Sequence, residues 1–182
     1  MKTITTLALC LIVVSGAAAG ADIDARLLRF SGEIPPVANL VTLLESDLIA
    51  NPTKFSAALN ERNTFEYRAL TPNEYPTSFD ANGKPDATAK RDTGIVFSGD
   101  AKISDGSYAL NINFSLVERT NTILYPTKTG ATVTQPVFRY KHIKTAITTK
   151  AGDWFILRLL DSDDKTAPSD PNHFVLLVRI RR

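Results

Sequence analysis

Cysteine is almost absent from this sequence, since Cys10 is the only one among 182 residues. A single cysteine excludes an internal disulfide and a zinc site built on several thiolates. Cys10 also lies inside an apolar run and follows the large Leu9, so we expect no lipid attachment there. A chain without disulfides must derive its stability from the packing of a hydrophobic core.

An excess of charge of one sign is missing as well. Of the 21 lysines and arginines one is Lys2, and the other 20 are matched by 19 acidic residues. A chain near neutrality has no global attraction for nucleic acid, so we expect no nucleic-acid partner. The one local basic cluster is Arg139–Lys144, RYKHIK. Such a cluster suits an anionic partner or, more commonly, an edge strand whose charge opposes aggregation.

Motifs of catalysis and cofactor binding are also lacking. The chain has no Gly-x-Ser-x-Gly elbow, no recognisable Ser, His and Asp set and no glycine-rich phosphate loop. His142 and His173 stand alone in expected strands, which favours structural or solvent-facing roles. Asp161–Asp164 begins like a calcium loop, but Thr166 and Asn172 replace the required glycine and glutamate, which favours a solvated loop. The sequence predicts no enzyme, cofactor or metal.

What is present begins with an export signal. Residues 1–19 combine Lys2, an apolar run from Leu7 to Val14, and the small residues Ala17–Ala19. The apolar run is well short of the roughly 20 residues that cross a bilayer as a helix. We therefore predict a cleaved signal peptide over 1–19 and a single domain over 20–182. The mature protein is expected in the periplasm, at the outer membrane or on the cell surface.

Apolar periodicity in the mature chain indicates mostly strands and one helix. From Ser107 to Glu118, apolar residues alternate with Asn, Ser and Ala, as in a strand with one buried face. Asp105-Gly106 and Ala151-Gly152 are typical of tight hairpin turns. Helical spacing after Pro36 predicts one helix over 37–50.

Two architectures fit such a series of strands. A soluble antiparallel two-layer β-sandwich, for example an immunoglobulin-like one, buries its apolar faces between two sheets. A membrane β-barrel shared among subunits turns them to lipid. We expect the mainly β sandwich with one N-terminal α-helix. The expected buried side chains are Phe114, Leu116, Trp154, Ile156 and Val178.

Residues 73–92, NEYPTSFDANGKPDATAKRD, are expected to form a long connector between two strands. The connector contains two aromatic residues, Tyr75 and Phe79. They either cover the edge of the sandwich or contact a partner. The Thr-rich segment around Pro126 and Gly130 is likewise expected to be a loop.

The C-terminal segments raise the question of a sheet edge. Residues 153–161 are apolar on both parities, which is typical of a central strand. The closing segment 174–182 is therefore expected at an edge, with Arg179 and Arg181 facing outward as charged guards. An edge strand can accept a strand of another protein, so we predict partner binding there or in the neighbouring polar loop. The alternative is a simple protected edge.

Several segments together resemble a known family. They are IDARLLRF (23–30), EYPTSFD (74–80), KRDTGIVFSGDAKISDGSYALNINFSL (90–116), KHIKTAITTKAGDWFILRLL (141–160) and FVLLVRIRR (174–182). In this order they resemble the C-terminal homology domain of the secretins, the outer-membrane channel proteins of type II and type III secretion and of type IV pili. The resemblance implies a secretin-domain-like form of the sandwich.

Departures from the family pattern indicate a shortened standalone relative. Arg158-Leu159-Leu160 replaces the usual Gly-Gly-Leu, a short polar loop replaces the membrane lip, and the expected helix replaces the glycine-rich gate. The periplasmic ring domains that precede the homology domain in the family have no counterpart among these 182 residues.

The resemblance implies a non-enzymatic exported accessory or structural protein of a type IV pilus or secretin-type secretion machine. Such a protein acts by protein–protein interaction, and membrane association without a transmembrane helix is compatible with it. The candidate partner-binding residues are Tyr75, Phe79, Arg179 and Arg181. The alternatives are an oligomeric outer-membrane secretin-like pore and a general immunoglobulin-like adhesion module.

Overall fold

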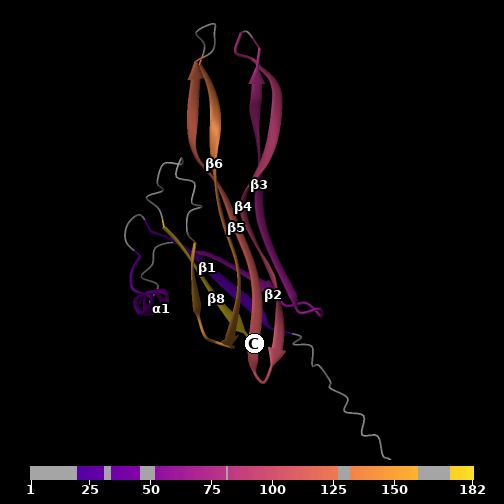
Figure 1. Ribbon diagram of the computed structural model, residues 1–182, viewed down its shortest axis with the longest axis vertical. Helices are drawn as coiled ribbons and strands as arrows, with labels where there is room; N and C mark the ends of the chain where they lie inside the picture. The colour runs from indigo at the N-terminus through magenta and orange to yellow at the C-terminus, as the bar shows by residue number, and fades with distance from the viewer. Residues whose placement is uncertain (1–19, 31–33, 46–51, 81, 127–131, 160–172) are drawn as a thin grey trace, which may run out of the picture.

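The computed structural model describes residues 20–30, 34–45, 52–80, 82–126, 132–159 and 173–182. The expected signal peptide and the Asp161–Asp164 loop lie outside these ranges. Within them the chain forms two four-stranded antiparallel sheets and one short helix (Figure 1). The order along the chain is β1 (Asp22–Phe30), α1 (Val37–Glu45), β2 (Thr53–Ala58), β3 (Thr64–Phe79), β4 (Pro85–Ser104), β5 (Ser107–Pro126), β6 (Thr132–Lys150), β7 (Phe155–Leu159) and β8 (His173–Arg181).

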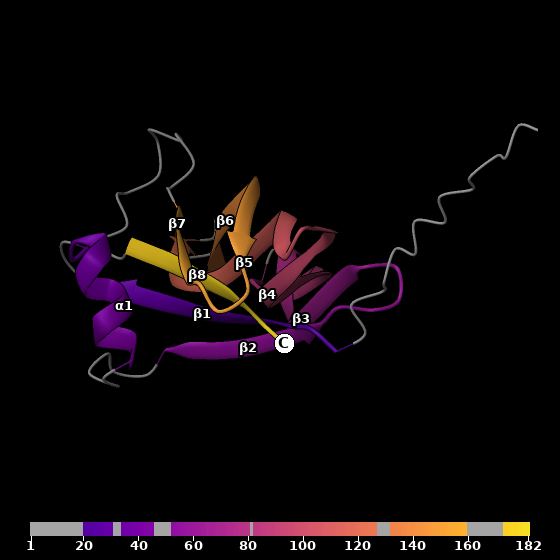
Figure 2. The same cartoon turned by 90° about the horizontal axis from the view of Figure 1, so that it is seen from below.

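The two sheets pack face to face as two layers, which confirms the mainly β, sandwich-like prediction. Sheet A has the strand order β2-β1-β8-β7, and sheet B has the order β3-β4-β5-β6 (Figure 2). Phe55 of β2 joins the layers, because its ring lies 4.9 Å from the ring of Tyr67 and 5.4 Å from that of Phe97, both in sheet B. Neither sheet closes on itself, so each has two edge strands.

Three of the five side chains expected in the core are buried. Phe114 and Val178 are fully buried, and Leu116 is 5 % exposed. Trp154 and Ile156 are only half-buried, which corrects the prediction. They lie on the outer face of sheet A beside a small second cluster of Leu28, Leu40, Val175 and Leu177.

The helix α1 covers part of that outer face. It begins at Val37, and the carbonyl of Pro36 accepts hydrogen bonds from the amides of Asn39 (2.9 Å) and Leu40 (3.3 Å). Leu40 is fully buried in the second cluster. Residues 46–51 lie outside the described ranges, so the expected extent of the helix to residue 50 is not confirmed.

The C-terminal strand β8 is central, and its prediction as a sheet edge is wrong. It pairs with β1 on one side and with β7 on the other, so β7 lies at the end of the described sheet. Phe174–Val178 are five consecutive buried residues, because sheet B covers one face of β8 and the second cluster covers the other.

The expected connector 73–92 is also wrong, because most of it is strand. β3 runs to Phe79, β4 begins at Pro85, and the turn between them is short. In the turn the amide of Asp80 donates to the carbonyl of Lys84, and the Asp80 carboxylate accepts from the amides of Asn82 and Lys84, each at 2.9 Å. Of the Thr-rich segment expected as a loop, the residues up to Pro126 belong to β5 and those from Thr132 belong to β6, whereas residues 127–131 lie outside the described ranges.

Candidate functional site

The candidate site is a pair of hairpin arms that extend from sheet B. β4 and β5 pair with each other only from Gly94–Val117 to Ser104–Ser107. Beyond that point each pairs only with its hairpin partner, β4 with β3 and β5 with β6. We call residues 71–93 the β3–β4 arm and residues 118–140 the β5–β6 arm. Figure 1 shows both arms projecting well past the sandwich.

Each arm leaves the sheet at a local irregularity. Gly94 has φ +127°, and a Cβ built on it would lie 1.9 Å from the carbonyl oxygen of Ala69. Only glycine fits a position of that kind. On β5, the pairing with β6 shifts register between Arg119 and Asn121, as in a β-bulge. Bulges increase local twist and bend a strand, so the two irregularities mark where the hairpins separate.

Prolines are distributed as the strand order requires. Pro72 and Pro76 lie within β3 and Pro136 lies within β6, and these are the edge strands of sheet B. The central strands carry proline only at their ends, at Pro85 and Pro126. A proline has no amide hydrogen, so it is tolerated at an edge and weakens pairing with a further strand.

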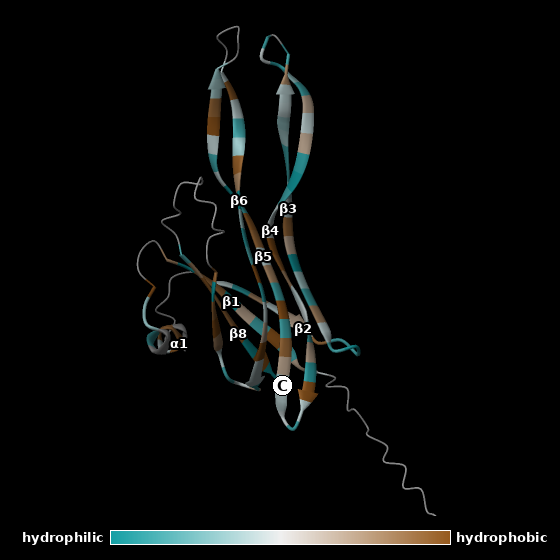
Figure 3. Ribbon diagram, viewed as in Figure 1, coloured by the Kyte–Doolittle hydropathy of each residue, from teal (hydrophilic) through white to brown (hydrophobic). Residues whose placement is uncertain are grey.

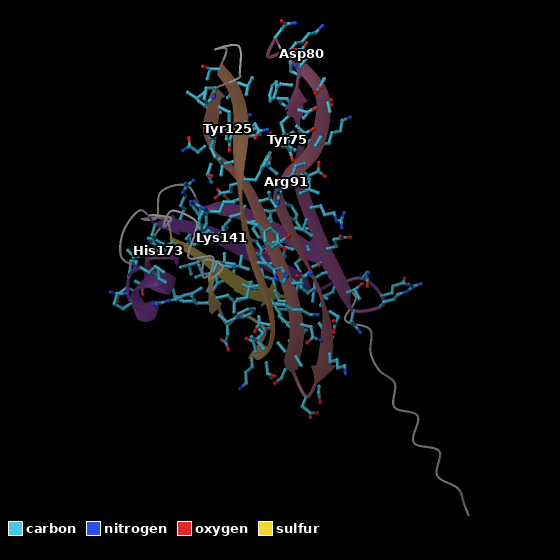
Figure 4. All side chains as sticks on the ribbon, turned by 45° about the horizontal axis from the view of Figure 1, so that its top comes forward. Tyr75, Asp80, Arg91, Tyr125, Lys141 and His173 are labelled. Carbon is cyan, nitrogen blue, oxygen red and sulfur yellow. The ribbon has the colours of Figure 1, made fainter. Side chains whose placement is uncertain are left out.

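The two arms touch through aromatic side chains. The ring centroid of Tyr75 on β3 lies 5.3 Å from that of Phe138 on β6, and the guanidinium of Arg91 lies 5.2 Å from the Phe138 ring. Figure 4 shows Tyr75 and Arg91 on one arm and Tyr125 on the other. The twist of the hairpins therefore brings together strands from opposite edges of the sheet.

The four candidate partner-binding residues fall in two separate places. Tyr75 and Phe79 are both half-buried on the β3–β4 arm, Phe79 next to its turn. Arg179 and Arg181 lie in sheet A, where they face acidic residues of β1 in register. Arg179 is 3.2 Å from the carboxylate of Asp24, and Arg181 is 2.8 Å from the same group. Partner binding by these arginines was predicted because β8 was expected at a sheet edge. The structure places β8 between β1 and β7, so it removes the basis for that prediction.

The basic cluster Arg139–Lys144 is divided between the two faces of β6. Lys141 is 2 % exposed, and its ammonium lies 4.9 Å from the ring of Phe174 inside the sandwich. His142 is exposed on the outer face, where it hydrogen-bonds to the side chain of Asn113 at 2.7 Å and stacks on Tyr140. His173 is exposed at the start of β8.

An exposed apolar triplet on the β5–β6 arm was not anticipated from the sequence. Ile123, Leu124 and Tyr125 are 44, 65 and 45 % exposed. Figure 3 shows hydrophobic bands on this arm and a mostly polar β3–β4 arm. The available signal was three consecutive large apolar residues within a stretch that otherwise indicates a polar loop.

The described residues form no cluster of metal-ligating side chains. No group of three His, Cys, Asp or Glu side chains among them lies close enough to hold a metal ion. A shallow depression on the outer face of sheet B is lined by polar groups that include Asp100, Asn111 and Lys144. The side-chain amide of Asn111 donates to the carboxylate of Asp100 at 2.8 Å, so two of these groups bond to each other. In the described part of the chain, no helix is long and apolar enough to span a membrane.

Comparison with protein-family models, with curated proteins and with solved structures finds no match. The resemblance to the secretin domain therefore depends on the sequence motifs alone.

Proposed function

We propose that this protein is a non-enzymatic, exported structural or accessory protein that binds protein components of a type IV pilus or secretin-type secretion machine. The observation that carries the proposal is the pair of arms that project from the sandwich. Ordering backbone costs about 1–2 kcal/mol per residue, and the arms lie largely outside the core that offsets this cost. Extensions positioned by a rigid scaffold are common sites of binding.

The β3–β4 arm has the character of a protein-binding surface. Phe79 lies near its end, opposite Pro85, and the outer part of the arm carries charges of both signs, with Glu74, Asp80 and Asp86 acidic and Lys84 basic. An aromatic residue within a polar rim is the usual composition of a transient protein interface.

The association with a pilus or secretin machine is supported by where the family-like motifs lie. EYPTSFD covers the end of β3 and the first residue of the following turn, and the start of the 90–116 motif includes Arg91 and Gly94. The segments that resemble secretins thus include those that build the β3–β4 arm and its departure point.

The strand order differs from that of an immunoglobulin-like sandwich. Sheet B is a simple meander of four consecutive strands, whereas immunoglobulin sheets exchange strands through Greek-key connections. This difference disfavours the general adhesion module.

Site-specific photo-crosslinking tests the proposal in cells that naturally produce the protein. A photoreactive amino acid replaces Phe79, and a matched control replaces Asp105 in the β4–β5 turn at the other end of the sheet. We expect adducts with pilus or secretin-machine proteins from position 79 and none from position 105. Adducts only between copies of this chain would favour the oligomeric alternative. The absence of adducts at 79, or identical adducts at both sites, would overturn the proposal.

A further inference from the structure

We infer that the β5–β6 arm docks onto the surface of an anionic phospholipid bilayer, with Ile123, Leu124 and Tyr125 entering the headgroup region. The inference goes beyond protein binding by the β3–β4 arm and does not depend on it.

The first observation is that the end of the arm is apolar on both sides. Successive residues of a strand point to opposite faces, so Leu124 faces away from Ile123 and Tyr125. All three are exposed. Their cross-strand neighbours on β6 are uncharged, Gln135, Thr134 and Val133. A groove on a protein covers one face of a ribbon, whereas immersion in the lipid interface covers both.

The second observation is charge. Within the arm, the sequence has one acidic residue, Glu118 at the base, which lies 3.8 Å from Arg29, and three basic residues, Arg119, Lys128 and Arg139. Basic residues next to apolar and aromatic ones are the combination that binds anionic membrane surfaces. The local charge therefore complements phosphate headgroups although the whole chain is close to neutral.

The third observation is the spacing along β5. Ile123 and the exposed Arg119 are separated by four residues, or roughly 13 Å at about 3.3 Å per residue of strand. Interfacial segments bury their apolar side about 5–10 Å deep. With the triplet at that depth and the arm upright, Arg119 lies about 3–8 Å outside the membrane surface, close enough for electrostatic attraction to the phosphates, and the sandwich stays in water.

The β3–β4 arm provides an internal comparison. It belongs to the same sheet and its hairpin is similarly long, but its outer half carries Glu74, Asp80, Lys84, Asp86 and Lys90. An exposed apolar end is therefore not needed to form such an arm. The asymmetry between the two arms indicates a specific use for the apolar one.

Vesicle co-sedimentation tests the inference directly. The mature protein is mixed with vesicles of phosphatidylcholine alone or of phosphatidylcholine with phosphatidylglycerol. The tip variant Ile123→Ser, Leu124→Ser, Tyr125→Ser is compared with the body variant Leu70→Ser, Tyr140→Ser, which removes exposed apolar groups at the base of the arms, next to the body of sheet B. We expect binding to the anionic vesicles that falls more than about tenfold in the tip variant and is retained in the body variant.

A fluorescence reporter keeps the test independent of solubility. In a Trp154→Phe background whose circular dichroism matches the natural protein, tryptophan replaces Leu124 or, as the matched control, the exposed Thr77 of the other arm. We expect anionic vesicles to shift the emission of Leu124→Trp to shorter wavelength and to leave that of Thr77→Trp unchanged. No binding to anionic vesicles, equal binding by the tip variant, or equal shifts at both positions would overturn the inference.

Discussion

Tyr75 of β3 packs against Phe138 of β6 at a ring-centroid distance of 5.3 Å, although the two strands are the opposite edges of sheet B. The contact lies beyond the point where β4 and β5 cease to pair. It is therefore a tertiary contact that links one arm to the other. Arg91 adds a cation–π contact to the same Phe138 ring.

A double-mutant cycle measures this link. Tyr75→Ala and Phe138→Ala should show a coupling free energy of about 0.5–1.5 kcal/mol in chemical unfolding, because aromatic pairs contribute that much beyond their buried area. The control cycle pairs Phe79→Ala with Phe138→Ala and should be additive. Additivity in the Tyr75 cycle would contradict the contact.

Truncation of the core aromatic Phe114 should be severe. Phe114 is fully buried between the sheets, so Phe114→Ala should lower the free energy of unfolding by about 3–5 kcal/mol. Leu124→Ala is the matched control, because Leu124 is 65 % exposed and should change stability by less than about 0.5 kcal/mol. Thermal unfolding of the two variants side by side gives the comparison, and equal melting temperatures would refute the burial pattern.

The glycine at the departure point of the β3–β4 arm should be intolerant of substitution. Gly94→Ala combines an unfavourable positive φ with a clash against the Ala69 carbonyl, so it should cost more than about 1 kcal/mol. Gly106→Ala has a positive φ of +76° but no atom within 4 Å of the added Cβ. Both variants share the strain of a positive φ, so the difference between their free energies of unfolding in urea measures the effect of the clash. Equal losses of stability in Gly94→Ala and Gly106→Ala would contradict the clash.

The cross-strand ion pair between β1 and β8 should respond to charge reversal. Asp24 and Arg179 are directly opposite each other on β1 and β8, so Arg179→Asp places two carboxylates face to face. This variant should lose about 1 kcal/mol or more of the free energy of unfolding. Adding Asp24→Arg restores opposite charges and should recover part of that loss. A double variant less stable than Arg179→Asp alone would show that the pairing does not stabilise the sheet.

The position of β8 could have been predicted from the sequence. Residues 153–161 were assigned to a central strand because both parities are apolar, yet Phe174–Val178 satisfy the same criterion more fully. Arg179 and Arg181 obscured this signal, because charged residues near the end of a strand also mark an edge. In the structure they face acidic residues of β1, and that pairing depends on strand order, which local sequence does not reveal.

The arms illustrate a different limit. The alternation from Tyr108 to Leu116 is clear because sheet A covers one face of β5 there. Past Val117 both faces of the hairpins lie largely outside the core. Neither face therefore requires apolar residues, and the sequence shows no alternation there. Turn-forming residues such as Asn82 and Gly83 then indicate a loop, although ladder hydrogen bonds continue up to the turn.

We propose that the β3–β4 arm binds protein partners and that the sandwich folds without it. Asn73 faces Arg91 in the ladder, so residues 74–90 can be replaced by a two-residue Asn-Gly turn that preserves the register below. We predict a shortened protein that retains its circular dichroism spectrum and recovers no pilus or secretin-machine proteins by affinity capture and mass spectrometry. Capture of the same partners at the same level by the shortened protein would contradict the claim, and so would failure of the shortened sandwich to fold.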